Sequence, residues 1–393
     1  MTGGRLSVLH VIPSVSPVHG GPSRAIATME RALAAAGIDV TTLTTDDDGP
    51  GRRLPPERQP ASANGAQRVY GRKWGEFYKV SPGLAVWLCR HVRRFDVVHV
   101  HALFSFSSVA AALIAKIAGV RYVVRPLGTL QGYGMTARRP WAKRISFALI
   151  EGPILRGAAA VHFTSLRERD EAAALGIPMR GVVVPLGIEG GGVTLADSGS
   201  VRRSILFLSR LDPKKNVEGL LEAFAALPAR HGKVRLEIAG RGEPGYEEAL
   251  RQHAAALGIA DSVDWLGHIE GADKEMAFER AALYVLPSYA ENFGIAPVEA
   301  LLAGVPCLLG EGVAIAGDVE RAGAGRSVAV AADAIGAAMA DLLDDPAELA
   351  AMSARAAAFA RSTYSAERMA DGLVDLYRSI LDAQADGRKE LTA

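Results

Sequence analysis

The sequence predicts an α/β protein with two doubly wound parallel-sheet domains. Short apolar runs typical of buried strands alternate with helical patterns, an order typical of parallel sheets. This pattern restarts after the Gly- and Ser-rich segment 189–200, which has the composition of a linker. The 393 residues, 49% of them apolar, are enough for two cores. We therefore expect an N-terminal domain over 1–188, the linker, a second domain over 201–364, and a C-terminal helix over 365–393 that packs back on the first domain.

The first half contains six apolar runs that we interpret as strands. They cover residues 6–12, 38–43, 96–101, 121–125, 159–163 and 182–184. Helices are expected from Pro22 to Gly37, from Ser81 to about Phe95, and over 107–118, because proline early and glycine late are typical helix boundaries. The segment 46–67 is rich in Asp, Pro, Gly and Arg and is expected to be a mobile loop.

The second half repeats the alternation. Strands are expected over 204–208, 234–239, 263–266 and 283–286, and from Val305 onward, with helices over 216–227 and 245–257. The Ala-rich tail from 333 to about 385 is expected to form several helices, one of them starting at Pro346.

Charge is divided unevenly along the chain. Residues 1–190 carry 24 Lys and Arg against 13 Asp and Glu, whereas the remaining residues carry 20 against 30. The basic half could meet anionic lipid, a phosphorylated acceptor or nucleic acid, and a chance difference in composition is the alternative. Cys89 and Cys307 give neither a disulfide framework nor metal-ligand spacing, and no signal peptide or membrane span is evident, so we expect a reducing cytoplasm.

The stretch 283–309, LYVLPSYAENFGIAPVEALLAGVPCLL, predicts strand, loop, helix and strand. Glu291 and Glu299 flank the start of the helix, and Gly294 stands at the turn. Glycine permits close approach of a ligand to the backbone, and the free N–H groups of a helix start attract anions. A diphosphate or phosphosugar is therefore the first ligand to consider, although an ordinary strand–helix unit with a solvated glutamate fits the spacing equally well.

Further polar residues follow predicted strands. Arg210 leaves the strand over 204–208, and Lys215 stands at the next helix start, so both are expected at the carboxyl edge of the sheet, where open α/β sheets bind ligands. Gly20 and Gly21 form a second glycine turn before a helix. His99 and His101 alternate along their strand and point to one face, although a histidine in such a position is more often structural.

Two basic segments suggest surfaces for binding. Residues 138–150, RRPWAKRISFALI, could form a basic amphipathic helix on an anionic membrane or a core helix with a solvated basic face. Residues 68–79 combine basic and aromatic side chains, on which bases or sugars could stack, although the aromatic residues could equally pack under the loop.

Taken together, the motifs HGGPSR, SRLDPKKN, EIAGRGE, VDWLGHIE and PSYAENFGIAPVEALLAGVPCL resemble those of the retaining nucleotide-sugar glycosyltransferases of family 4. The similarity runs in order from about residue 6 to about residue 310. It implies the GT-B fold, in which two Rossmann-like domains face a cleft. It also implies a hexosyltransferase of the bacterial surface-polysaccharide type.

The resemblance assigns roles to individual residues. Arg210 and Lys215 match the cations on the donor diphosphate, Glu299 the ribose-binding carboxylate, and Glu291 the one facing the transferred sugar. The remaining donor-binding positions are Gly20, Gly21, Gly240, His268, Asn292, Phe293, Gly294 and Ile295. Many members carry a histidine where this chain has 124–129 (VRPLGT), so His101 is the candidate from the neighbouring strand.

The function implied is retaining transfer from a nucleoside diphosphate sugar, such as a UDP-sugar, to a hydroxyl of a glycan or lipid-linked acceptor. No metal or other cofactor is expected, because fixed cations and helix starts can stabilise the leaving diphosphate. Nucleic acid is not an expected partner. We expect a cytoplasmic protein that is peripheral on the inner membrane face through its basic first domain. A sugar-nucleotide epimerase and a non-catalytic nucleotide-sugar-binding subunit are the alternatives.

Overall fold

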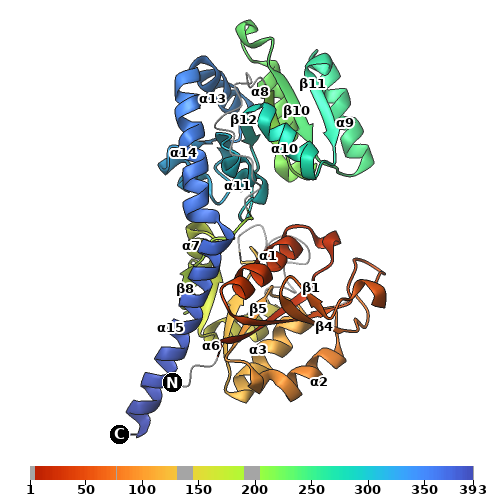
Figure 1. Ribbon diagram of the computed structural model, residues 1–393. Coiled ribbons are helices and arrows are strands. Elements are labelled where there is room, and N and C mark those ends of the chain that lie inside the picture. Colours follow the sequence, from red (N-terminus) through yellow and green to blue (C-terminus); the bar gives the residue numbers. More distant parts are fainter. Residues whose placement is uncertain (1–4, 77, 131–144, 190–203, 393) are drawn as a thin grey trace. The chain divides into compact units, whose positions relative to one another are not determined.

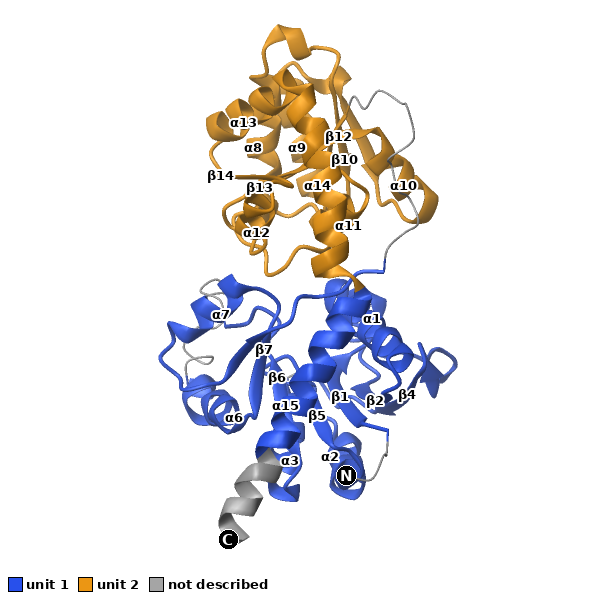
Figure 2. Ribbon diagram, turned by 60° about the vertical axis from the view of Figure 1, so that its left-hand side comes forward, with its two compact units in different colours: residues 1–189, 366–393 blue, residues 190–365 orange. Residues whose placement is uncertain are grey.

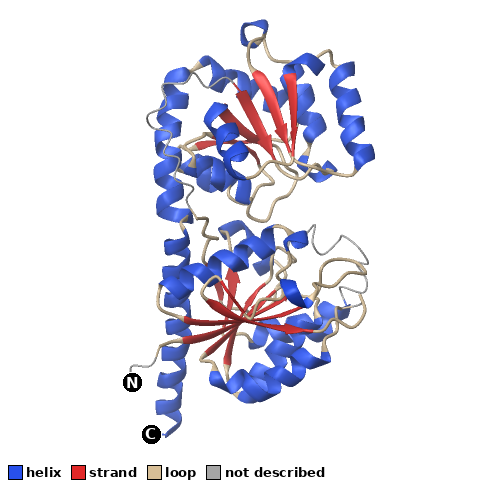
Figure 3. Cartoon of the chain, turned by 45° about the vertical axis from the view of Figure 1, so that its right-hand side comes forward, coloured by secondary structure: helices blue, strands red, loops and turns tan. Residues whose placement is uncertain are grey.

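The structure, a computed structural model, describes residues 5–76, 78–130, 145–189 and 204–392. The chain forms two compact units (Figure 2). Unit 1 comprises Met1–Glu189 and Ala366–Ala393, and unit 2 comprises Gly190–Ser365. In each unit, helices flank a sheet (Figure 3), which is the predicted doubly wound α/β architecture. Most of the predicted linker and the basic part of 138–150 lie outside the described residues.

Unit 1 is built on an eight-stranded sheet in the order β3-β4-β2-β1-β5-β6-β7-β8. Its pairings are parallel, except that β3 and β4 pair antiparallel. The strands are β1 (Ser7–Ser14), β2 (Asp39–Thr45), β3 (Ser62–Ala63), β4 (Ala66–Gly71), β5 (Val97–His101), β6 (Arg121–Arg125), β7 (Ala160–Phe163) and β8 (Gly181–Val183). Every residue of β5 is buried because helices cover both faces of the sheet (Figure 1).

The helices of unit 1 lie between and after these strands. They are α1 (Gly21–Ala35), α2 (Pro82–His91), α3 (Phe106–Ala118), α6 (Gly152–Gly157), α7 (Leu166–Ala173) and α15 (Ala366–Thr392), with short turns η1 (Pro17–His19), η2 (Pro56–Arg58), η3 (Val92–Arg94) and η4 (Phe147–Glu151). Local signals explain several boundaries. Ser105 Oγ accepts a hydrogen bond from Ser108 N at the start of α3, and Gly119 ends that helix in the left-handed conformation.

One part of unit 1 differs from the sequence prediction. The segment expected to be a mobile loop ends in strand β4, which pairs with β2 from Thr41↔Gln67 to Thr45↔Gly71. The sequence AQRVYG has few apolar residues because β4 lies near the sheet edge and is only partly buried. A strand at this position therefore lacks the apolar run that identifies central strands.

Unit 2 is built on a six-stranded parallel sheet in the order β11-β10-β9-β12-β13-β14. Its strands are β9 (Ser204–Leu208), β10 (Arg235–Ala239), β11 (Val263–Gly267), β12 (Ala281–Leu286), β13 (Cys307–Gly310) and β14 (Gly325–Val328). Its helices are α8 (Val217–Ala225), α9 (Pro244–Ala256), α10 (Gly271–Arg280), α11 (Ile295–Leu302), α12 (Ala316–Arg321), α13 (Ala332–Asp344) and α14 (Pro346–Tyr364), with turns η5 (Pro213–Lys215), η6 (Ala229–His231) and η7 (Ala260–Ser262).

The strand order of unit 2 puts β9 beside β12 at the centre of the sheet, so the loops that follow both strands lie at one edge. Leu283, Val285 and Leu308 are fully buried and fix these strands in the core. None of the described helices is long and apolar enough to span a bilayer.

Candidate functional site

The loops after β9 and β12 are joined by hydrogen bonds. Tyr289 N and Ser288 Oγ both donate to the carbonyl oxygen of Lys214, each at 3.0 Å. Asn216 adopts the left-handed conformation directly after Lys215. Its Nδ2 donates to Val330 O at 2.8 Å, and its Oδ1 accepts from the Tyr289 hydroxyl at 3.0 Å. These contacts fix the backbone that carries Lys215.

Lys215 forms an ion pair with Glu291. The Lys215 side chain is 9% exposed and that of Glu291 is 23% exposed, so the pair lies just below the surface of the sheet edge. Burial, together with the charges of Lys214 and Arg210, lowers the pKa of Lys215 to about 8. The carboxylate of Asp212 acts in the opposite direction because it favours the charged ammonium.

Arg210 leaves the end of β9 at the same edge. Its side chain is 74% exposed, and its Nη2 lies 3.9 Å from Asp212 Oδ2. Its charge is close enough to contribute to the lowered pKa of Lys215. Arg210 can therefore reach a bound anion without breaking a buried contact.

The turn before α11 requires glycine. Gly294 has φ of 86°, and a Cβ at this position would lie 3.0 Å from the Pro297 ring and 3.5 Å from Glu291 Cγ. Ile295 is the first residue of α11, so amides at the start of this helix face the loop that holds Glu291. Glu291 N donates to Gly312 O at 3.0 Å, which fixes the loop from its other side.

Asn292 and Phe293 complete this turn. Phe293 is buried and packs edge-on against Tyr364, with ring centroids 5.5 Å apart. Among the described residues, nothing bonds the buried Oδ1 of Asn292. Phe293 therefore anchors the turn, whereas Asn292 retains an acceptor that a ligand could use.

Glu299 lies on α11 and pairs with Lys274 of α10, whose Nζ is 2.8 Å from Glu299 Oε1. The remaining predicted donor-binding residues of unit 2 follow β10 and β11. Gly240 has φ of 148°, and a Cβ there would lie 1.8 Å from Ser209 O, so only glycine fits. His268 is exposed, and its Nε2 lies 3.0 Å from Glu270 Oε1.

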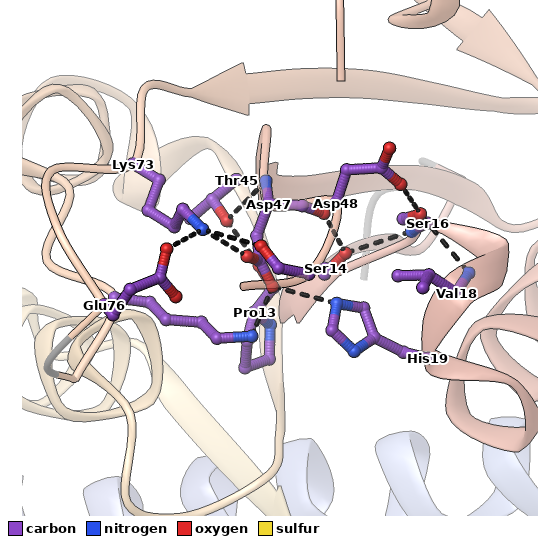
Figure 4. A network of polar contacts seen from close by, with 12 residues as sticks. Pro13, Ser14, Ser16, Val18, His19, Thr45, Asp47, Asp48, Lys73 and Glu76 are labelled. Carbon is purple, nitrogen blue, oxygen red and sulfur yellow. Dashed lines mark hydrogen bonds and ion pairs between the residues drawn. The ribbon is translucent and has the colours of Figure 1, made fainter. Parts of the chain in front are cut away.

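In unit 1, Gly20 and Gly21 form the turn between η1 and α1, with Gly20 at φ of 65°. The residue before them, His19, is held by Asp47, which follows β2: His19 Nε2 and Asp47 Oδ2 are 2.9 Å apart. Figure 4 shows that Asp47 lies between Lys73 and His19. The glycine turn is therefore fixed to the ends of the neighbouring strands.

Asp47 is the centre of this network. Lys73 Nζ donates to Asp47 Oδ1 at 2.7 Å, Lys79 forms a second ion pair with it, and Ser14 Oγ donates to its carbonyl oxygen at 2.7 Å. Burial would raise the pKa of Asp47, but hydrogen bonds from Lys73 and Lys79 outweigh it and lower the pKa. Asp47 is therefore an ionised carboxylate that positions the loop of His19.

Family models match both units of the chain. The model described as "Glycosyl transferase 4-like domain" matches residues 20–187, and the model described as "Glycosyl transferases group 1" matches residues 198–359. The chain belongs to the family 4 glycosyltransferases, which have the GT-B fold.

Curated relatives of this glycosyltransferase include two mannosyltransferases. A phosphatidyl-myo-inositol mannosyltransferase of Mycobacterium leprae is 29% identical over 225 residues, which is 54% of each chain. A GDP-mannose:cellobiosyl-diphosphopolyprenol alpha-mannosyltransferase of Xanthomonas oryzae is 27% identical over 317 residues, covering 78% of this chain and 79% of the relative. This chain thus spans about half of the first relative's length and four-fifths of the second's.

Solved structures share the fold. Sucrose-phosphate synthase from Thermosynechococcus elongatus has a TM-score of 0.75 at 18% identity, covering 96% of this chain and all of that one. Anabaena HepE in complex with UDP has the same TM-score and identity over 95% of this chain. The predicted GT-B fold is therefore confirmed.

His101 of the glycosyltransferase lies inside unit 1. It is fully buried and stacks on His10 and His99, at centroid distances of 5.0 and 4.3 Å. Its Nε2 lies 2.7 Å from His10 Nδ1. In this conformation the His101 ring does not reach the surface of unit 1.

His162 and Tyr377 extend this buried layer, which we call the histidine layer (His10, His99, His101 and His162). His162 Nε2 donates to Val184 O at 2.8 Å, so a neutral His162 accepts at Nδ1 from His99 Nε2, 3.3 Å away. His99 Nδ1 then accepts from the Tyr377 hydroxyl of α15 at 2.7 Å. Neutral rings therefore satisfy the hydrogen bonds of His162 and His99, whereas the buried His10 Nε2 and His101 Nδ1 have no hydrogen-bond partner among the described residues.

The same layer contains the group of described residues that could hold a metal ion. Ring nitrogens of His10, His99 and His101 lie within 4.8 Å of one another. Arg125, buried beside them, lowers the pKa of each ring through its positive charge and would equally oppose a bound cation. We therefore assign the cluster a packing role beneath α15.

Sequence reasoning missed two sets of residues. Asp47, Lys73 and Lys79 come together from different loops, and only the run of three aspartates after β2 signals a polar site. Lys274 carries no sequence signal, because a lysine in the first turns of an exposed helix is ordinary.

Proposed function

We propose that this glycosyltransferase moves a hexose from a nucleoside diphosphate sugar to a hydroxyl of a lipid-linked or glycolipid acceptor, with retention of anomeric configuration. The observation that carries the proposal is the Lys215–Glu291 pair beside the glycine turn of α11. A cation, a carboxylate and free helix amides at one sheet edge match the three parts of a sugar diphosphate: the phosphates, the sugar hydroxyls and the leaving oxygen.

The chemistry follows from these groups. The acceptor hydroxyl forms a bond to the anomeric carbon while the bond from that carbon to the diphosphate breaks. The leaving diphosphate takes the electron pair and accepts the hydroxyl proton. Lys215 and Arg210 stabilise the charge that grows on the diphosphate, and Glu291 binds hydroxyls of the transferred sugar. These groups need no metal, so we expect transfer to continue in EDTA.

The names of the relatives support a lipid-linked acceptor. One acts on phosphatidyl-myo-inositol and the other on cellobiosyl-diphosphopolyprenol. Assembly of a bacterial surface glycan on a lipid carrier, at the inner face of the membrane, fits such an acceptor and the basic first half of the chain.

The surface of unit 1 supports peripheral membrane binding. Helix α3 exposes Leu113 and Ile117, and the segment around η4 exposes Leu149. Arg90 and Lys116 lie on α2 and α3, which pack against each other. Apolar side chains beside basic ones favour an anionic bilayer surface. We expect binding to phosphatidylglycerol vesicles at low salt, weakened by Ile117→Ser.

Two controls apply to the vesicle test. Met276→Ser changes an exposed apolar residue of unit 2 and should leave vesicle binding unchanged. Equal binding to neutral phosphatidylcholine vesicles would contradict the electrostatic part of the proposal.

A donor screen tests the reaction itself. The protein is incubated with UDP- and GDP-sugars and membrane lipid extract, and products are identified by mass spectrometry and by NMR of the anomeric proton. A new glycolipid with the donor's anomeric configuration is the expected result. Alteration of the donor sugar without any acceptor would indicate an epimerase, and tight nucleotide binding without transfer would indicate a non-catalytic subunit.

A further inference from the structure

Each of the two carboxylates at the sheet edge of unit 2 has its own lysine. Glu291 pairs with Lys215, and Glu299 pairs with Lys274. The second pair comes from different helices, since Lys274 is in the first turns of α10 and Glu299 is in the middle of α11. The side chain of Glu299 is 16% exposed, so its carboxylate is held in a partly buried position.

The Lys274 contact engages one oxygen of the carboxylate. Nζ lies 2.8 Å from Oε1, and no described residue donates a hydrogen bond to Oε2. An ionised carboxylate has about four acceptor positions, so Oε2 retains its capacity for a ligand hydroxyl. Lys274 therefore fixes Oε1 of Glu299, while Oε2 stays available to a ligand.

Helix α10 is fixed near its C-terminus, which makes Lys274 a stable support. Near its C-terminus, Arg280 donates from Nε and Nη2 to Glu237 on β10, both at 2.9 Å. A lysine on a helix anchored in this way loses less rotamer freedom when it holds a partner. The conformational entropy that is lost when Glu299 is oriented is then lost already in the free protein rather than when a ligand binds.

Charge gives Lys274 a second effect. A nucleoside diphosphate is an anion, and an unpaired carboxylate beside it would repel it. Lys274 neutralises Glu299, as Lys215 does Glu291 in the absence of ligand. With both carboxylates neutralised, the exposed guanidinium of Arg210 and the amides at the start of α11 attract the phosphates.

We propose that Lys274 is a positioning residue for the nucleotide: it holds Glu299 Oε1 so that Oε2 accepts hydrogen bonds from the ribose hydroxyls. This inference rests on the proposed function, because the nucleoside diphosphate and the ribose role of Glu299 belong to it. The alternative is a structural tether between α10 and α11 that has no effect on ribose recognition.

The test compares nucleotides with and without ribose hydroxyls. Binding of UDP and 2′,3′-dideoxy-UDP, and of the corresponding guanosine pair, is measured by calorimetry. The wild type should prefer the ribonucleotide by about tenfold or more, as for hydrogen bonds to a charged group. Lys274→Met should reduce this preference to about threefold or less, because Glu299 is no longer held in place. Lys274→Arg should restore part of the preference, because arginine can also donate to Glu299.

Two further variants separate the ribose role from a tether. Glu299→Gln should lose the preference, and the double variant Lys274→Met/Glu299→Gln should lose no more than Glu299→Gln alone. As a control, Arg230→Met breaks an exposed ion pair of unit 2, with Asp344, that involves neither α10 nor α11, and it should keep the wild-type preference. Melting temperatures of all variants show whether any of them is unfolded.

The outcomes are distinguishable. If Lys274→Met and Lys274→Arg keep the full preference while Glu299→Gln loses it, Lys274 is a tether and the inference fails alone. If the wild type binds nucleoside diphosphates without any preference for ribose, the inference also fails. If the wild type binds no nucleoside diphosphate, both the proposed function and this inference are refuted.

Discussion

Lowering the pH from 7.5 to 5.5 should destabilise unit 1 through its histidine layer. All four rings are fully buried. Burial lowers the pKa of His10 to about 4 and that of His162 to about 3, with Arg125 lowering both and Glu30 raising that of His10. The pKa values of His99 and His101 also lie well below 6.5, because of burial and then the neighbouring rings and Arg125.

The sign follows from proton binding. The unfolded chain protonates its histidines as the pH falls below about 6.5, whereas in the folded layer the pKa of His10 is about 4, that of His162 is about 3, and those of His99 and His101 are also lowered. The unfolded state therefore binds more protons, so stability is complete above pH 6.5 and is lost below it. At pH 5.5, protonation of the unfolded chain lowers the free energy of unfolding by about 1.4 kcal/mol for each of His10 and His162, or about 3 kcal/mol for the two, and His99 and His101 act in the same direction.

Urea denaturation at several pH values measures this effect. Tryptophan fluorescence is recorded in a Trp265→Phe variant, so that the signal comes only from Trp74, Trp87 and Trp141, which all belong to unit 1. His162→Gln keeps a donor for Val184 and an acceptor for His99, and should remove about 1.4 kcal/mol of the pH dependence at pH 5.5.

The control is His253→Gln in unit 2, which should not alter the pH dependence of unit 1. The reasoning is refuted if the free energy of unfolding of unit 1 changes by less than about 2 kcal/mol between pH 7.5 and 5.5. It is also refuted if His162→Gln leaves the pH dependence unchanged while the protein remains folded.

Three substitutions test the two sites. Lys215→Ala should lower turnover on the order of 100-fold or more, because a cation at the leaving diphosphate is lost; near-normal turnover would contradict this. Glu291→Gln should lower kcat more than it weakens nucleotide binding in calorimetry, and the reverse would point to a role in the nucleotide site. Asp47→Ala leaves the buried Lys73 with only Glu76 and the Gly49 carbonyl oxygen as partners and should destabilise unit 1 by about 1 to 3 kcal/mol in urea, whereas the exposed Asp39→Ala should have little effect.

Much of the fold can be read from the chain because central parallel strands are apolar throughout. The runs ending at His101 and Leu286 are buried on both faces and were predicted as strands. The helix starts at Pro82 and Pro346 follow from the fixed φ of proline. Strand β4 was missed because it lies next to the edge strand β3, where a partly buried strand needs no apolar run.

Site residues were predictable where the backbone gives a local signal. Gly294 and Lys215 stand at loop-to-helix junctions, and topology alone brings them to one edge. Contacts between distant side chains carry no such signal, which is why Lys274 was not found. For His101, alternation predicted correctly that its ring lies on the same face as His99. It could not predict that both rings are fully buried and that the Tyr377 hydroxyl of α15 bonds to His99.

Helix α15 follows unit 2 in the sequence but belongs to unit 1. During synthesis the eight strands of unit 1 leave the ribosome before all of unit 2, and Tyr377 emerges after it. Until then His99 lacks its hydroxyl partner and the histidine layer stays open to water, where imidazoles protonate readily. Unit 1 is therefore the first part of the chain to begin folding and the last to finish.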